Sequence, residues 1–284
     1  MKKVRKRLLL FIIIFGVLIW LLLRYKPGLI TEIPREIKKI SEKQDEKIEK
    51  FINPNERHLM SQVQERKLFN NLPEDLKIHT YKYPESRSSI VLYEKYKNDN
   101  SPIDISKEIK DMDRQNRGRN SLPYFNQWDT RWGFKKVEEG FFLNSGCGPT
   151  TLSMVYVGLT KDPSLNPYDM ARKAYKAGYY KDSIGSYHTL FTKFASNNLG
   201  LKGRQIERSE RSIKNAIDNG KIVVLLVRHN GIGDFTMGGH FMIITDYQDK
   251  LVTILDANSY NNTNKKWDID RVLLQTESVF ELSK

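Results

Sequence analysis

Cys147, the only cysteine of the chain, has a glycine on either side and is followed by Pro149. Proline is favoured in the first turn of a helix, so the pattern predicts that Cys147 lies at a helix N-terminus. The free N–H groups and partial positive charge of that end favour a thiolate and can hold an oxyanion. A lone cysteine is more often a small buried apolar residue, but this setting favours a nucleophile. A single cysteine also excludes a disulfide scaffold and a cysteine-rich metal site.

A nucleophilic cysteine needs a base, and the chain has five histidines. His240 follows two glycines and opens an apolar segment typical of a strand, so we expect it to be accessible, rigidly held and the base. His229, at the end of another strand-like segment, is the weaker candidate. The others are expected on the surface: His188 at the start of a helix, and His58 and His79 outside the compact domain.

A predicted hairpin brings an acid near His240. Two strand-like segments, 240–247 and 251–256, flank a tight turn and should pair in antiparallel register. With a two-residue loop and no bulge, Asp256 faces Ile243, three residues from His240. The two polar residues then lie near the same end of the sheet, and a bulge would change the offset between them.

Asp256 is therefore the expected partner for the second ring nitrogen of His240, which orients a catalytic base. It ends an apolar segment, where a polar side chain can turn toward the site. The competing interpretation is a turn-forming aspartate. Asn258 is the alternative orienting residue, because Cys–His–Asn sites also occur.

The elements that must position these residues follow a simple order along the chain. Helical patterns come first and apolar strand-like segments second, which favours an α+β fold. The compact domain is expected to begin near residue 121, where aromatic residues and glycines become frequent. Expected helices cover 150–158, 167–177, 188–198 and 209–219; expected strands cover 222–227, 240–247, 251–256, 272–282 and, before the domain, 89–93.

Residues 122–282 resemble the peptidase C39-like family of papain-like cysteine peptidases. The matching pieces are Leu122-Pro123-Tyr124, Gln127-Trp128-Asp129, Trp132-Gly133, Gly146-Cys147-Gly148-Pro149-Thr150, Tyr187-His188, Gly239-His240-Phe241 and Asp256-Ala257-Asn258-Ser259. The resemblance implies a papain-like fold, with the cysteine on the central helix of a helical N-terminal lobe. It also implies that the histidine and the acid lie on an antiparallel sheet.

The same resemblance implies a triad of Cys147, His240 and Asp256. Papain-like enzymes add a glutamine that donates to the oxyanion, and Gln127 is the matching position, 20 residues before Cys147. A loop glutamine beside packed tryptophans is the competing interpretation of Gln127. Such an enzyme requires no metal and no organic cofactor.

The first 26 residues carry +7 of the chain's net charge of +13. Residues 8–23 are uncharged and apolar, and as a helix they would span about 24 Å, which bilayer thinning and snorkelling arginines can match. No small-residue cleavage site follows, so we expect residues 1–26 to be an uncleaved signal anchor rather than a cleaved signal peptide. The positive-inside rule then predicts a single-pass cell-membrane protein with a cytoplasmic N-terminus and an extracytoplasmic catalytic domain.

Residues 27–120 are expected to form a charged helical stalk or linker before the domain at 121–284. Because more than half of the charge excess flanks the membrane segment, the net charge does not indicate a nucleic-acid partner. The pattern leaves open whether 27–120 is a stalk or a pro-segment that covers the cleft. It also leaves the oligomeric state open.

These features predict a membrane-anchored thiol hydrolase that cleaves peptide (amide) bonds through an acyl-enzyme. Outside the membrane, the expected substrates are secreted peptides, wall-associated proteins or the peptide bridges of a cell wall. The alternative is a non-catalytic binding or scaffold protein that retains the papain-like fold.

Overall fold

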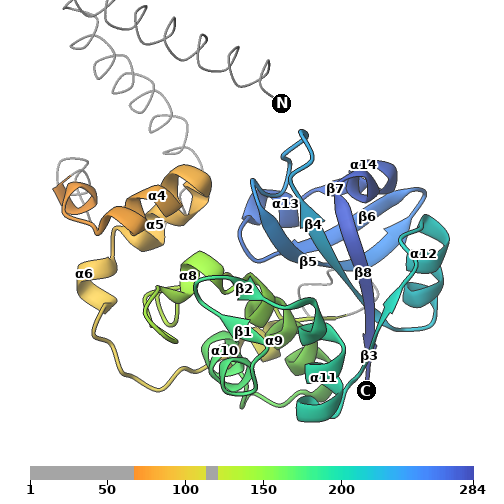
Figure 1. Ribbon diagram of the computed structural model, residues 1–284, viewed down its shortest axis with the longest axis horizontal. Helices are drawn as coiled ribbons and strands as arrows, with labels where there is room; N and C mark the ends of the chain where they lie inside the picture. The colour runs from red at the N-terminus through yellow and green to blue at the C-terminus, as the bar shows by residue number, and fades with distance from the viewer. Residues whose placement is uncertain (1–66, 113–120) are drawn as a thin grey trace, which may run out of the picture. The chain divides into compact units, whose positions relative to one another are not determined.

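The computed structural model describes residues 67–112 and 121–284 (Figure 1), which lie within one compact unit, Leu59–Lys284. The apolar segment 8–23, His58 and the predicted stalk before residue 67 lie outside the described residues. Within the two described ranges, none of the helices has the length and apolarity that crossing a bilayer requires. The architecture combines helices with an antiparallel sheet, and the helices come first in most of the domain, as the sequence predicts.

The helical part of the domain contains the helix that begins at the cysteine. This helix, α9 (Cys147–Thr160), is buried along most of its length, which explains why it is apolar on nearly every side. Figure 1 shows the neighbouring helices gathered around it. The other elements of this part are α8 (Phe142–Ser145), α10 (Pro167–Lys176), β1 (Tyr180–Lys181), β2 (Gly185–Ser186), η3 (His188–Phe191) and α11 (Lys193–Leu199).

A six-stranded antiparallel sheet in the order β3-β8-β4-β5-β6-β7 forms the second part. Its strands are β3 (Lys202–Ile206), β4 (Ile222–Arg228), β5 (Gly239–Gln248), β6 (Leu251–Asp256), β7 (Lys266–Asp268) and β8 (Thr276–Ser283). The helices of this part are α12 (Glu210–Asp218), α13 (Tyr260–Thr263) and α14 (Ile269–Leu274).

The sheet is covered on both faces, which explains the continuous apolar sequence of β4. Alternate residues of β4 belong to two apolar clusters, one shared with α9 and α10 and the other with α12 and α14. A strand that is buried on both faces has no polar alternation. The strand predicted at 222–227 is therefore confirmed as a buried central strand.

The hairpin of β5 and β6 contains a bulge, whereas the predicted register assumed none. Asp249 and Lys250 have φ of 51° and 64°, which is the geometry of a type I′ turn. A shift in the middle of β5 then pairs Asp256 with Met242, so the predicted pairing one residue further along β5 is wrong. The offset of Asp256 from His240 becomes two residues instead of three. Because side chains alternate along a strand, an even offset places both on the same face.

Residues 67–112 pack against the helical part, because an apolar cluster joins three of their side chains to four from the domain. The members are Leu72, Leu76 and Ile90, together with Trp128, Phe134, Phe141 and Leu143. Burying one leucine, isoleucine or phenylalanine side chain stabilises the folded state by about 1.5–3 kcal/mol. Buried contacts therefore cross the boundary predicted at residue 121. The elements of this segment are α4 (Glu74–Lys82), η2 (Pro84–Ser86), α5 (Arg87–Ile90), α6 (Tyr93–Tyr96) and α7 (Ser106–Asp111).

Two strand predictions are wrong, wholly or in part. Residues 89–93 lie in the helical turns of α5 and α6, because this spacing places Ile90 and Tyr93 against the same apolar cluster. The segment 272–282 starts within α14, where Val272 packs under the sheet, and becomes β8 only afterwards. The helix predicted at 188–198 is divided into η3 and α11.

Candidate active site

Cys147 is the first residue of α9, as predicted, and is a free, partly exposed cysteine. The glycines on either side are required by close packing. A Cβ on Gly146 would lie 2.5 Å from the ring of Phe142, and one on Gly148 would collide with the side chain of Ser186. The helix N-terminus can therefore come this close to its neighbours only with glycine at both positions.

His240 and Asp256 form a buried pair beside Cys147. The Nε2 atom of His240 lies 2.7 Å from Oδ1 of Asp256, and both side chains are 1% exposed. His240 also interacts with the Cys147 side chain. Because Nε2 donates to the carboxylate, Nδ1 is the ring nitrogen left for the thiol. The structure thus brings the three predicted triad residues together, but the prediction that His240 is accessible is wrong, because its ring is buried against Asp256.

The charge of the pair is set by a competition between burial and the carboxylate. Burial alone lowers the pKa of the His240 imidazole, because a buried charge loses its hydration. The negative charge of Asp256 and the hydrogen bonds to Asp256 and Cys147 outweigh burial and raise the pKa of His240 to about 10. The site therefore favours an imidazolium beside the cysteine at neutral pH.

The Asp256 carboxylate is held by two further donors. The backbone N–H of Asn258 donates to Oδ1 at 2.8 Å, and Nδ2 of Asn262 donates to Oδ2 at 2.9 Å. Asn258, the alternative orienting residue, thus supports the acid through its backbone, whereas Asp256 contacts His240. Asn262 was not predicted. It lies in α13, which begins at the N-cap Ser259, and no spacing in this polar stretch distinguishes it.

Gln127 is buried and lies next to the helix that precedes the cysteine. Its Nε2 donates to the carbonyl oxygen of Leu143 at 2.6 Å, and its backbone N–H donates to Ala257 at 2.8 Å. The side chain is therefore fixed between the helical part and the end of β6. Nε2 uses one of its two hydrogens in the bond to Leu143, and Oε1 is buried without a hydrogen-bond partner.

The other described histidines lie away from the triad. His229 is exposed in the loop after β4. His188 lies at the surface, 3.6 Å from Glu277. The prediction that His79 is exposed is wrong: its side chain is buried, and Nδ1 lies 3.1 Å from Oδ1 of Asn144. The amphipathic packing of α4 on the domain, which the sequence pattern did not show, accounts for this.

We expect His79 to make the fold sensitive to acid. Burial lowers the pKa of His79 to about 3, although the hydrogen bond to Asn144 opposes this and Lys82 adds to it. Below the unfolded value of about 6.5, the unfolded chain binds a proton that the folded chain does not, so stability falls as the pH falls. Between pH 7 and pH 5, wild type should lose about 2 kcal/mol more than His79→Gln. Urea unfolding at both pH values measures this difference, and equal losses in the two proteins would contradict it.

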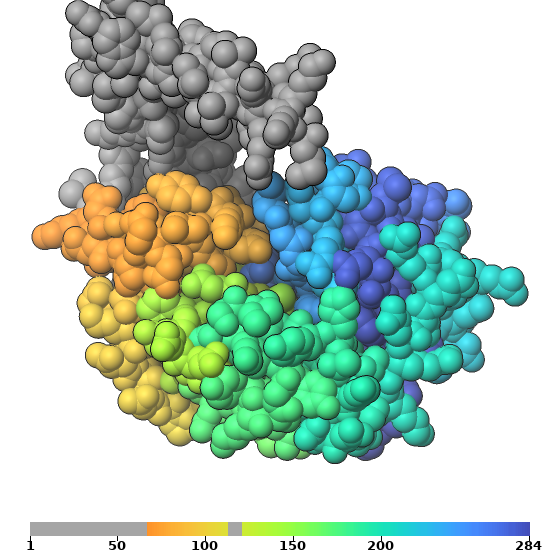
Figure 2. All heavy atoms as spheres, viewed as in Figure 1, coloured from red at the N-terminus to blue at the C-terminus, as the bar shows by residue number. Residues whose placement is uncertain are grey.

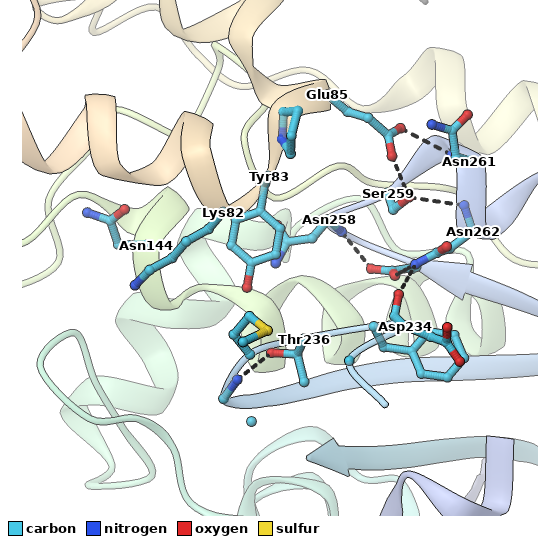
Figure 3. A pocket seen from close by; sticks show the side chains of 17 residues that line it. Lys82, Tyr83, Glu85, Asn144, Asp234, Thr236, Asn258, Ser259, Asn261 and Asn262 are labelled. Carbon is cyan, nitrogen blue, oxygen red and sulfur yellow. Dashed lines mark hydrogen bonds between the residues drawn. The ribbon is translucent and has the colours of Figure 1, made fainter. Parts of the chain in front are cut away.

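A cavity of about 610 Å³ lies beside the triad. Residues 82–85 form one wall, residues 233–239 form another, and Asp256 and Asn258 line it between them. Figure 3 shows the Tyr83 phenol pointing into this cavity toward Thr236. In Figure 2 the orange segment and the sky-blue loop lie next to each other. Among the residues that the structure describes, no group of three His, Cys, Asp or Glu side chains could hold a metal ion.

Known proteins share this domain. The sequence model of the Peptidase_C39 like family matches residues 119–283. The crystal structure of a putative C39-like peptidase from Bacillus anthracis is similar, with 17% identity, 58% of this chain and 96% of that chain covered, and a TM-score of 0.39. The peptidase domain of Streptococcus ComA, a bifunctional ABC transporter involved in a quorum-sensing pathway, has 18% identity, 49% and 90% coverage, and a TM-score of 0.36. No curated protein matches the sequence. The family match spans more than half of the sequence, and the chain belongs to the peptidase C39-like family.

Proposed function

We propose that this protein is a thiol hydrolase that cleaves peptide (amide) bonds with Cys147, His240 and Asp256. The observation that carries the proposal is the buried His240–Asp256 pair, 2.7 Å apart, beside a cysteine at a helix N-terminus. Membership of the peptidase C39-like family supports a cysteine peptidase. Strongly shifted titratable groups cluster at functional sites, which supports a catalytic role for this pair.

In the proposed reaction, the sulfur of Cys147 attacks the amide carbonyl carbon and forms a tetrahedral intermediate. His240 then delivers its proton to the leaving amine, the C–N bond breaks, and a thioester remains. Water next attacks the thioester while His240 takes up a proton. The acid product leaves as the sulfur departs from the carbonyl carbon, and the thiolate–imidazolium pair is regenerated. Asp256 fixes the ring and stabilises the imidazolium throughout.

The backbone N–H of Cys147 and the side chain of Gln127 are proposed as oxyanion donors. We expect Gln127→Ala to lower kcat/KM by roughly 10²–10³-fold, because one donor to the developing charge is lost. Alkylation of Cys147 by iodoacetamide forms no oxyanion, so its rate should not change. Steady-state kinetics and alkylation rates separate the two effects. A parallel fall in both would mean that Gln127 only supports the fold around α8.

The proposed activity is tested by mass spectrometry of peptides and cell-wall fragments incubated with the purified protein. Fragments with new carboxyl and amino ends should appear with wild type and be missing with Cys147→Ala. If both proteins release the same fragments, or if wild type releases none, the proposal fails.

We also propose that residues 8–23 anchor the protein in the cell membrane, with the catalytic domain outside. The basic flank of this apolar segment should stay in the cytoplasm. Protease added to intact cells is expected to digest the domain, and the N-terminal sequence of the mature protein should begin within residues 1–7. Protection from the protease would contradict the orientation, and an N-terminus after residue 23 would contradict the uncleaved anchor.

A further inference from the structure

A short strap, defined as residues 79–85, crosses from one side of the candidate site to the other. At its start, His79 binds Asn144, which lies three residues before Cys147. At its end, Glu85 accepts hydrogen bonds from Oγ of Ser259 at 2.5 Å and from the backbone N–H of Asn261 at 3.1 Å. Ser259 follows Asp256 by three residues. The strap therefore connects the part that carries the cysteine with the part that carries the histidine and the acid.

The strap is fixed at both ends by packed elements. It starts in α4, whose Leu76 is fully buried, and it ends in η2, which continues into α5 with the fully buried Ile90. Detaching the strap would expose these apolar side chains to water, which is unfavourable. The strap also lies outside residues 119–283, which the family model matches. It is thus a rigid addition to the family domain.

The strap forms one wall of the cavity. Tyr83 and Glu85 line the cavity, and Figure 3 shows both reaching across it from the strap. Burial raises the pKa of Tyr83 to about 12, with a further contribution from the nearby Cys147. The phenol therefore lies close to the nucleophile. The strap thus spans the candidate site beside the nucleophile, where it would prevent a substrate chain from continuing past Cys147.

The charges of the cavity indicate which kind of chain end fits. Asp234 is paired with Arg271 at 2.7 Å, and Asp256 is paired with His240. Glu85 is occupied by its two hydrogen bonds to the start of α13. Within the described residues, Lys82 is the one charged residue of the lining without an ion pair or a charge-assisted hydrogen bond. Lys82 is exposed, and Figure 3 shows its side chain extending on the side of the cavity where Asn144 lies.

We propose that the strap makes this protein specific for peptide chain ends and that Lys82 binds the free terminal carboxylate of the substrate. An ammonium attracts a carboxylate and repels an amino terminus, so it selects one kind of chain end. The inference rests on the proposed hydrolase and names the substrate class of the same site: peptides with a free carboxyl end, cut close to that end.

The test uses the full-length protein and two matched random-sequence peptide sets, one with free carboxyl ends and one with amidated ends. We expect wild type to cleave the free-acid set about tenfold better in kcat/KM, the effect of one charge-assisted contact. Mass spectrometry should place the cuts near the carboxyl end. Lys82→Gln should bring the ratio close to one, and Lys82→Glu should reverse it. Tyr83→Ala should add internal cuts. The matched control is Lys95→Gln. Lys95 is exposed in α6 and does not line the cavity, so this variant should keep the wild-type ratio of free-acid to amidated cleavage.

Alkylation of Cys147 by iodoacetamide at pH 6 keeps the two proposals apart. A rate no faster than that of free cysteine means that the proposed hydrolase itself is wrong, and the inference fails with it. If alkylation is fast but the two peptide sets are cleaved equally, the hydrolase stands and the recognition of the carboxyl end is overturned. The same holds if alkylation is fast and neither set is cleaved. Internal cuts by wild type, or a ratio that Lys82→Gln leaves unchanged, overturn it as well.

Discussion

Cys147→Ser is expected to lower amide hydrolysis by roughly 10⁴-fold or more, to the level of the background. The hydroxyl of serine is a far weaker nucleophile than a thiolate, and the proposed mechanism requires a thiolate beside the His240 imidazolium. His240→Ala should lose nearly as much, because residues that act as a unit do not contribute additively. The double variant should therefore be no worse than either single variant. Steady-state kinetics on a substrate found with wild type measures all three.

His229→Ala and His188→Ala are the matched controls for His240→Ala. Both histidines are exposed and lie away from the triad, so their removal should leave kcat/KM within about twofold of wild type. If His229→Ala abolished activity in a folded protein while His240→Ala retained it, the assignment of the base and of Asp256 would both be wrong.

Asp256→Asn is expected to lower the rate by roughly 10²-fold and to change its pH dependence. An amide can still orient the imidazole but does not stabilise the imidazolium. In wild type the raised pKa of His240, about 10, keeps the ring protonated through neutral and mildly alkaline pH. Loss of the carboxylate leaves only the interaction with Cys147 to oppose burial and so lowers the pKa of His240, and the alkaline fall in kcat/KM should move to lower pH. A pH–rate profile of both proteins measures the shift.

Asn258→Ala separates the two candidates for the orienting residue. Its backbone N–H still donates to Asp256 after the substitution, so the alkaline limb should stay where it is in wild type. If the alkaline fall in kcat/KM moves to another pH in Asn258→Ala but not in Asp256→Asn, the orienting residue is Asn258.

The same pairing affects stability with a definite sign. Because the folded pKa of His240 lies above its unfolded value of about 6.5, the pair contributes fully to stability below that pH. The contribution is lost as the pH rises toward 10. His79 acts in the opposite range, since its lowered pKa reduces stability below pH 6.5. Both effects confine the most stable range to near-neutral pH.

Local patterns predicted the parts of the site that depend on short stretches of sequence. The Gly-Cys-Gly-Pro segment places Cys147 at the start of α9, because glycine packing and a proline in the first turn are local constraints. The two glycines before His240 and the end of an apolar strand at Asp256 likewise mark positions in β5 and β6. These positions are marked by the local sequence alone, without any contact between distant residues.

The remaining features depend on contacts between distant segments, which periodicity does not show. The bulge in β5 changes the offset of Asp256 by one residue, and no glycine or proline marks it in the sequence. Asn262 supports the acid from a helix of one turn. The segment before the domain looks solvated because it is rich in charged residues, yet Leu76 and His79 are buried against the domain. Its short apolar stretch at 89–93 resembles a strand, but the cluster that it joins is reached by helical turns.

The rate of Cys147 alkylation by iodoacetamide as a function of pH tests the central claim most directly, because it needs no substrate. Free cysteine is about 0.3% thiolate at pH 6. A thiol that transfers its proton to His240 should react on the order of 100-fold faster than free cysteine at this pH, and His240→Ala should remove the advantage. The account predicts this fast, histidine-dependent reaction in wild type. A wild-type rate that follows free cysteine across the pH range, with no effect of His240→Ala, would contradict it.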